Sequence, residues 1–393
     1  MTSEKSSPDK AVPPETWEFP VEDGLVVARP DLPSLFCLNR SARIIWAAYR
    51  ETGSEESTAA TLAETFGIPL DLAQRDTQAA VNGWAAAGLL GQPRPAEPLH
   101  WEGTHGDPLV LAYCSLEGTS FLLLTDSPAV IAEVTPRLVS LSVAPCEPDV
   151  TIAIWSCAND RFAIVVGDTC IAVEQGAPAA RAVLFQELAM RACPGRKWLA
   201  LLHAGACGID GRCVLFPASS YSGKSTLAAA LMASGFDLYS DDFLGISANS
   251  LQIPPMPFAI ALRRGSWDVL RPLIPHIEDS PALERASEQL RFLPIRQGND
   301  VAAGEATAIV FTQWAADAAF SEQRLSTADV ISRLSQAGFW VRHDRDSIGA
   351  FLAWLERLPK STLRYSDLSQ AIGYVTALAT APGGPTTSTT NFA

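Results

Sequence analysis

The chain has 393 residues, enough for two or three domains of roughly 150 residues, and 48 % of them are apolar, which excludes a largely disordered or fibrous protein. Its 29 Lys and Arg against 43 Asp and Glu give a net charge of −14, which argues against nucleic-acid binding because phosphates are gripped by cations. No run approaches the roughly 18 apolar residues of a membrane span, and the N-terminus lacks the apolar stretch of a secretory signal. We therefore expect a cytoplasmic protein that binds neither nucleic acid nor membranes, and the sequence leaves open whether it forms a homo-oligomer.

The cysteines and histidines show no metal-binding spacing. Eight cysteines are scattered without a Cys-x-x-Cys pair, and of the five histidines only His100 and His105 lie close together. This pattern indicates reduced thiols rather than disulfides or a structural zinc site.

Composition divides the chain into two α/β domains. Residues 1–17 and 381–393 are rich in Pro, Gly, Ser or Thr, and we expect both to be disordered. A similar composition marks 91–108 as a linker between a small module over 18–90 and a larger domain over 109–380.

The small module is predicted to be winged-helix-like, with two strands and three short helices. Asn39 or Ser41 can cap the first helix, and Gly53 ends it. The expected strands cover 24–28 and 34–38, and the second and third helices cover 57–66 and 72–87.

The larger domain begins with strand-like runs, and its C-terminal part is expected to be helical. Strands are predicted over 109–114, 121–125, 150–155, 162–166, 170–173, 201–204, 212–216, 238–240 and 243–246. Helices are predicted over 180–193, 224–234, 327–337, 348–358 and 368–378.

The most informative motif lies within residues 212–234, where an apolar strand runs into a loop of Walker A type and then into an Ala/Leu-rich helix. The loop residues are Ala218, Ser219, Ser220, Tyr221, Ser222, Gly223, Lys224, Ser225 and Thr226. Gly223 lets backbone N–H groups turn toward phosphates, Lys224 can reach the β- and γ-phosphates of ATP, and Ser225 can ligate Mg²⁺. The flanking strand and helix favour this P-loop interpretation over a chance Gly-Lys-Ser.

Two acids follow the loop. Asp241 and Asp242 come directly after a short strand, 17 positions beyond Lys224. Such a pair can hold Mg²⁺ and accept a hydroxyl proton, whereas the alternative is an ordinary polar turn. The neighbouring phosphate loop favours the functional interpretation.

Residues 201–246 resemble the catalytic core of the HPr serine kinase family, with a strand His before the loop (His203), the Gly-Lys-Ser-Thr run and the Asp-Asp pair in order. A looser resemblance extends over 109–380. It implies an α/β P-loop kinase domain that phosphorylates a serine hydroxyl with ATP and Mg²⁺. The resemblance implies that one aspartate of the pair is the proton acceptor and that His203 lies near the phosphates. We assign the proton acceptor to Asp241, and metal or orientation support to Asp242. A hydrogen-bonded structural histidine is the alternative for His203.

The chain departs from this family at two places. Tyr221 stands where family loops usually carry glycine, which bears on the backbone path over the phosphates. The Glu-Leu-Arg-Gly run of bifunctional members is absent, and its nearest counterpart is 261–267, so the resemblance does not extend to reverse phosphorolysis. Within that segment Arg263 and Arg264 are candidates for neutralising phosphate, or else a solvated surface pair.

Residues 21–90 resemble the PqqD-like peptide-binding fold. The marks are the strand pair, Leu38-Asn39 before a helix with Trp46, and the closing run from Trp84 to Leu90. The resemblance implies binding of the leader of a ribosomally made precursor peptide, which adds a strand to an exposed sheet edge. A DNA-binding winged helix is disfavoured because 20–90 holds five basic and nine acidic residues.

Three functions stay in contention. The favoured one is a serine kinase that recruits a precursor peptide through the N-terminal module. The others are a kinase of a free small hydroxyl compound and a nucleotide-binding peptide chaperone without transfer activity, the last suggested by Tyr221.

Overall fold

The chain forms two compact units. The computed structural model describes residues 10–13, 15–22, 24–91, 99, 101, 103, 106–193, 195–217, 222–285, 288–295 and 301–381. The first unit combines the chain up to Glu97 with Leu325–Ser335 and Arg342–Glu356, and the second holds Pro98–Arg324, Gln336–Val341 and Arg357 onward. Most of the predicted linker, and the ends beyond residues 10 and 381, lie outside the described residues.

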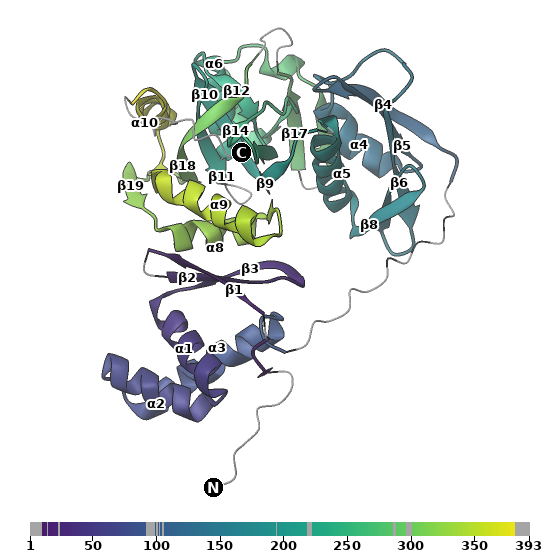
Figure 1. Ribbon diagram of the computed structural model, residues 1–393. Coiled ribbons are helices and arrows are strands. Elements are labelled where there is room, and N and C mark those ends of the chain that lie inside the picture. Colours follow the sequence, from purple (N-terminus) through teal and green to yellow (C-terminus); the bar gives the residue numbers. More distant parts are fainter. Residues whose placement is uncertain are drawn as a thin grey trace. The chain divides into compact units, whose positions relative to one another are not determined.

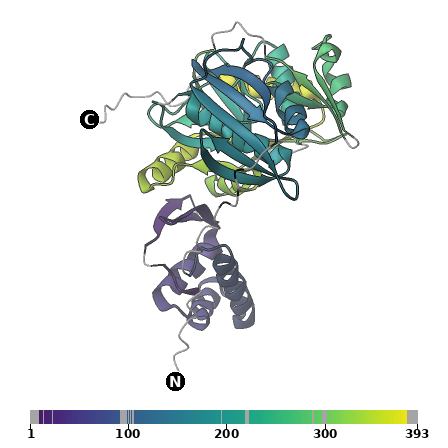
Figure 2. The same ribbon diagram turned by 90° about the vertical axis from the view of Figure 1, so that its right-hand side faces the viewer.

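The N-terminal part of the first unit is a three-stranded antiparallel sheet with three helices on one face (Figures 1 and 2). Its elements are β1 (Trp17–Val21), β2 (Gly24–Arg29), β3 (Leu32–Leu38), α1 (Arg40–Thr52), α2 (Glu55–Phe66) and α3 (Leu70–Ala86). The prediction of two strands was wrong, because β1 pairs with β2 within a segment that starts where disorder was expected. Pro20 within β1 is compatible with its place at the sheet edge.

Local capping signals set the helix ends of this module. The Asn39 side chain accepts a hydrogen bond from the Ala42 N–H, and Gly53 ends α1 in the left-handed region with φ of 64°. Ser54 caps α2 through the Ser57 N–H. These short-range interactions explain why the helices begin and end close to the predicted positions.

Arg29 ties the end of the module to its sheet. The side chain is 2 % exposed and donates to the carbonyls of Gly88 and Gly91 at 2.8 and 2.9 Å. Its guanidinium also forms a two-bond ion pair with Asp31, at 2.8 and 2.6 Å. The hydrogen bond from Arg29 lowers the pKa of Asp31.

We expect Arg29→Met to destabilise the first unit by about 3 kcal/mol, because two carbonyls and a carboxylate lose their buried donor. Urea unfolding of the full chain measures the effect. The control is Arg75→Met, since Arg75 pairs with Asp71 on the surface, where such pairs contribute roughly 0–1 kcal/mol. Equal unfolding midpoints for Arg29→Met and Arg75→Met would contradict the prediction.

The ion pair between Arg29 and Asp31 should also make stability depend on pH. Because the Asp31 pKa is depressed, the stabilisation of the fold by this ion pair is present above pH 3.8 and is lost as the pH falls below that value.

The other face of this sheet is covered by later segments of the same unit, helices α8 (Thr327–Ala337) and α9 (Arg345–Arg357) (Figure 1). Alternate residues of a strand point to opposite faces, and Val26, on the face away from α1, is fully buried. Cys37 Sγ lies 3.4 Å from the Ala328 carbonyl, and His343 Nε2 lies 2.6 Å from the Arg29 carbonyl. The module therefore has a core on each side of its sheet.

The second unit begins with a five-stranded sheet in the order β4-β5-β6-β7-β8. Its strands are β4 (Leu109–Leu116), β5 (Thr119–Thr125), β6 (Val150–Cys157), β7 (Arg161–Val166) and β8 (Thr169–Gln175). Helices α4 (Pro128–Val134) and α5 (Ala177–Ala192) pack on one face, and a short 3-10 turn covers Thr135–Arg137.

A second sheet has the order β12-β10-β11-β18-β21-β19, with β14 paired to β18. Its members are β10 (Ala204–Ile209), β11 (Arg212–Pro217), β12 (Asp237–Ser240), β14 (Gln252–Ile253), β18 (Gly304–Trp314), β19 (Ser321–Arg324) and β21 (Lys360–Tyr365). Strands β11, β18 and β21 are parallel neighbours, and β10 is antiparallel to both β11 and β12. The carboxyl ends of β11, β12, β18 and β21 therefore meet at one edge of the sheet.

Smaller elements complete this unit. One sheet holds β9 (Trp198–Leu202), β13 (Leu244–Ser247) and β20 (Phe339–Val341), and another holds β15 (Ile260–Arg263), β16 (Ala282–Arg285) and β17 (Glu288–Leu293). The remaining helices are α6 (Lys224–Ala233), α7 (Arg264–Leu270) and α10 (Leu368–Thr380), with a 3-10 turn at Ile277–Asp279. No helix in the described part of the chain is both long and apolar enough to cross a bilayer. All eight cysteines are free thiols.

One strand prediction was wrong, and a central strand was not predicted. The expected strand over 201–204 is two strands, β9 and β10, which enter different sheets with His203 at the corner between them. The three expected C-terminal helices are present as α8, α9 and α10, whereas the eleven-residue β18, which is central to the second sheet, was missed. Its buried run of Ala, Ile, Val and Phe has no strand periodicity, because a central parallel strand is covered on both faces.

Candidate functional site

The turn into α6 requires glycine. Gly223 has φ of 90°, and a Cβ there would lie 2.9 Å from Trp314 Cβ and 3.0 Å from Tyr365 Oη. Any other residue would combine backbone strain with a clash, so Gly223 holds the position that the motif predicted. Residues Ala218–Tyr221 of the predicted loop lie outside the described residues.

Cationic side chains surround one carboxylate beside this turn. Asp242 Oδ1 lies 2.7 Å from His203 Nε2 and 3.7 Å from Lys224 Nζ. Arg181 Nη1 donates to Asp242 Oδ2 at 2.9 Å. The structure thus brings together three sequence-predicted residues and adds Arg181.

The neighbouring carboxylate has a different partner. Ser225 Oγ donates to Asp241 Oδ2 at 3.0 Å, while Asp241 Oδ1 is buried with no hydrogen-bond partner among the described residues. The two acids therefore face different groups: Asp241 lies against the helix hydroxyl, and Asp242 lies among the cations.

Sheet topology explains why these groups meet. Asp241 and Asp242 follow the carboxyl end of β12, and His203 precedes β10, which runs antiparallel to β12. The His203 ring is held by a second contact, 3.0 Å between Nδ1 and the Ala337 carbonyl. Both ring nitrogens of His203 therefore lie within hydrogen-bond distance of an oxygen.

The environments of the two acids push their pKa values apart. Burial, with the like charge of Asp242, raises the pKa of Asp241 above its usual value, against the opposing effect of Lys224. Burial acts on Asp242 as well, but the hydrogen bond from His203 and the Lys224 and Arg181 cations hold the pKa of Asp242 well below its usual range. Asp241 is only 4 % exposed, whereas the Asp242 side chain is 31 % exposed. Asp242 is thus the ionised acid that an incoming group can reach.

Sequence reasoning missed three charged residues behind Asp242. Arg181 on α5 lies 3.3 Å from Glu133 Oε1 on α4, and Glu133 also pairs with Arg137 at 3.0 Å. Arg137, Glu133 and Arg181 form a largely buried series of ion pairs that ends at Asp242. No local signal could have found them, because Arg181 and Asp242 are 61 residues apart.

The predicted arginine pair sits on a neighbouring element. Arg263 ends β15 and Arg264 begins α7, where its guanidinium lies 4.8 Å from the centre of the Trp267 ring. The hydroxyls of Thr226 and Ser266 lie 2.6 Å apart, so α7 contacts α6.

The chemistry of this cluster suits a nucleotide with a divalent cation. The N-terminus of α6 and the Lys224 ammonium together favour an anion such as phosphate. Within the described residues, no group of three or more His, Cys, Asp or Glu side chains could hold a metal by itself. Mg²⁺ does not require one, since it is commonly held by one or two carboxylates and substrate phosphates. The Ser225 hydroxyl and the unpartnered Asp241 oxygen fit that role.

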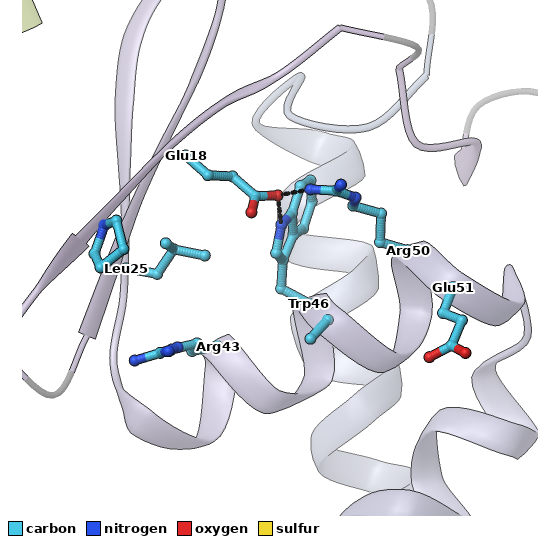
Figure 3. Close-up of a pocket in the computed structure, with 8 residues that line it drawn as sticks. Glu18, Leu25, Arg43, Trp46, Arg50 and Glu51 are labelled. Carbon is cyan, nitrogen blue, oxygen red and sulfur yellow. Dashed lines mark hydrogen bonds and ion pairs between the residues drawn. The ribbon is translucent and has the colours of Figure 1, made fainter.

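The first unit has a pocket of about 620 Å³ between β1, β2 and α1 (Figure 3). The Glu18 carboxylate accepts a hydrogen bond from Trp46 Nε1 at 2.8 Å and pairs with Arg50. Leu25 and Trp46 supply apolar surface, and Arg43 projects from α1 on the side of Leu25. The pocket thus combines an apolar wall with an exposed cation.

The comparison with known families decides the character of this module. A family model described as coenzyme PQQ synthesis protein D (PqqD) matches residues 24–90. Residues 24–90 are a PqqD-family domain. The PqqD domain contains β2, β3 and α1 to α3, whereas β1 with Glu18 precedes the match. This confirms the predicted resemblance for the N-terminal module. A search of curated proteins found no match to the chain, and the kinase core stays a prediction.

Proposed function

We propose that the chain is an ATP-dependent kinase that phosphorylates a serine hydroxyl of a precursor peptide bound through its PqqD domain. The observation that carries the proposal is the convergence of Lys224, Ser225, Asp241, Asp242 and His203 at the N-terminus of α6. The PqqD family model supports a role in precursor-peptide modification.

The PqqD domain is suited to hold an extended peptide. β1 and β3 are both edge strands, so the sheet has backbone groups for an added strand. The pocket beside β1 supplies Leu25 and Trp46 for an apolar side chain and Arg43 for an acidic one. Backbone pairing would give affinity, and such pockets would give specificity.

In the proposed reaction the α6 N-terminus and Lys224 bind the terminal phosphates of ATP. Ser225 and Asp241 would hold Mg²⁺, which when bound neutralises charge on the phosphates. The serine oxygen forms a bond to the γ-phosphorus, the bond from that phosphorus to the β-phosphate oxygen of ATP breaks, and ADP leaves with the electron pair. The serine proton passes to Asp242.

This division of roles is the opposite of the one expected from the sequence. Asp242 is exposed enough to meet an acceptor hydroxyl, and the cations around it keep it ionised. Asp241 is buried against Ser225, where it can hold a cation but cannot reach a peptide. Arg181 and His203 act as positioning residues for Asp242.

We expect Asp242→Asn to lower the transfer rate by roughly 10²- to 10⁴-fold while ATP binding persists, because a general base is lost. Asp241→Asn should instead raise the Mg²⁺ concentration needed for half-maximal rate. Titrations of Mg²⁺ and ATP with each variant measure both effects. Asp268→Asn, at an exposed surface ion pair, is the matched control. The reverse pattern would restore the assignment of Asp241 as proton acceptor.

The decisive test of function incubates the full chain with precursor peptides encoded near its gene, ATP and Mg²⁺, and reads phosphoserine by mass spectrometry. Transfer to peptide supports the proposal. ATP turnover with small hydroxyl compounds only would identify a small-molecule kinase. Tight ATP and peptide binding without turnover would identify a chaperone.

A further inference from the structure

An exposed tryptophan stands beside the phosphate-loop turn. Trp314 is the last residue of β18, and 52 % of its surface is exposed. Its backbone N–H donates to the Ser222 carbonyl at 3.0 Å, and its Cβ would contact any side chain placed at Gly223. The Thr312 hydroxyl, two residues earlier on the same strand, lies 3.3 Å from Ser222 Oγ. Trp314 is therefore fixed to the described end of the loop at its backbone, while its indole is open to solvent.

Sheet order places Trp314 on the opposite side of β11 from the acid pair. β11 leads into the loop, and its parallel neighbour β18 ends in Trp314. On the other side of β11 come β10, which His203 precedes, and β12, which Asp241 and Asp242 follow. In open α/β sheets, ligands lie outside the carboxyl ends of the parallel strands, where all these groups meet.

A nucleotide is long enough to use both sides. If its terminal phosphate lies at Asp242 and Lys224, its ribose and base can occupy the other side of β11, where β18 ends in Trp314. An exposed indole offers a flat π face, and a base stacked on it removes apolar surface of both from water.

We infer that Trp314 stacks on the nucleobase of ATP and so distinguishes nucleoside triphosphates from bare polyphosphate. The inference rests on the proposed function, because it takes the phosphate site as the place where ATP binds. The contact is to the base alone, so it contributes to affinity for ATP and nothing to affinity for inorganic tripolyphosphate.

The test measures binding of ATP and of inorganic tripolyphosphate to the full chain by calorimetry in the presence of Mg²⁺. Trp314→Ala should weaken ATP binding by roughly tenfold to a hundredfold, the range for loss of one base–aromatic stack. Tripolyphosphate binding should stay unchanged, and Trp314→Phe should keep most of the ATP affinity. Phe66→Ala, at an exposed aromatic of the other unit, is the control and should change neither.

The outcomes separate the inference from the function beneath it. Unchanged ATP affinity in Trp314→Ala would overturn the stacking inference while leaving the nucleotide site intact. An equal loss for ATP and tripolyphosphate would also overturn it, because Trp314 would then support the loop rather than the base. Wild-type chain that binds neither compound would overturn the proposed function and the inference with it.

Discussion

Replacing Lys224 by Met is expected to lower phosphate transfer by roughly 10²- to 10³-fold, the loss typical of removing one preorganised donor to developing charge. Lys224 is nearly buried, and its ammonium lies 3.7 Å from Asp242 Oδ1. It is the only lysine at the N-terminus of α6. Without the Lys224 ammonium, the terminal phosphates lose their cation. Asp241 and Asp242 also lose a positive charge that offsets the repulsion between them. Phosphopeptide formation and ADP release measure the loss.

The matched control is Lys197→Met, at an exposed lysine of the same unit that lies outside the cluster. It should transfer phosphate at the wild-type rate. Circular dichroism of both variants checks that the fold is retained. Phosphate transfer by Lys224→Met at the wild-type rate would show that the phosphates bind elsewhere. It would contradict the assignment of the ATP site to the N-terminus of α6.

Removing the leader from the substrate peptide is expected to lower kcat/KM by roughly 10²-fold or more, with a smaller change in the saturated rate. In the proposed function, a peptide held by the PqqD domain would meet the proposed kinase site at an effective concentration in roughly the millimolar range. A leaderless peptide would instead have to be captured from solution by the proposed kinase site alone. Initial rates with full and leaderless peptides over a range of concentrations measure the difference.

This experiment varies the peptide because truncating the chain is not a clean test. α8 and α9 pack against the PqqD sheet within one unit, so deleting residues 1–95 would expose the buried faces of both helices. The full chain with Arg43→Glu supplies a second variant, since Arg43 is exposed in the pocket beside β1. Arg75→Glu, on the surface of α3, is its control. Equal efficiency for both peptides would reject recruitment and favour the small-molecule kinase.

Local sequence alone determined several features of this protein. Asn39 and Gly53 set the ends of α1, because caps depend on groups within one helical turn. Gly223 and Lys224 mark the strand-to-helix turn for the same reason, since the motif is a contiguous run. The PqqD domain was also readable, because its strands and helices follow one another along a single short segment.

Only the tertiary structure decided what surrounds these local features. β18 was not predicted, because a central strand is apolar on both faces and shows no alternating pattern. Likewise, α8 could not be assigned to the first unit from its own amphipathic pattern. Arg181 lies 61 residues from Asp242 in the chain, yet it is one of the cations that keep that acid ionised. The different environments of Asp241 and Asp242 likewise come from burial and from partners on other elements. Periodicity and capping report on neighbours in the chain, whereas the electrostatics of a site depend on neighbours in space that folding alone brings together.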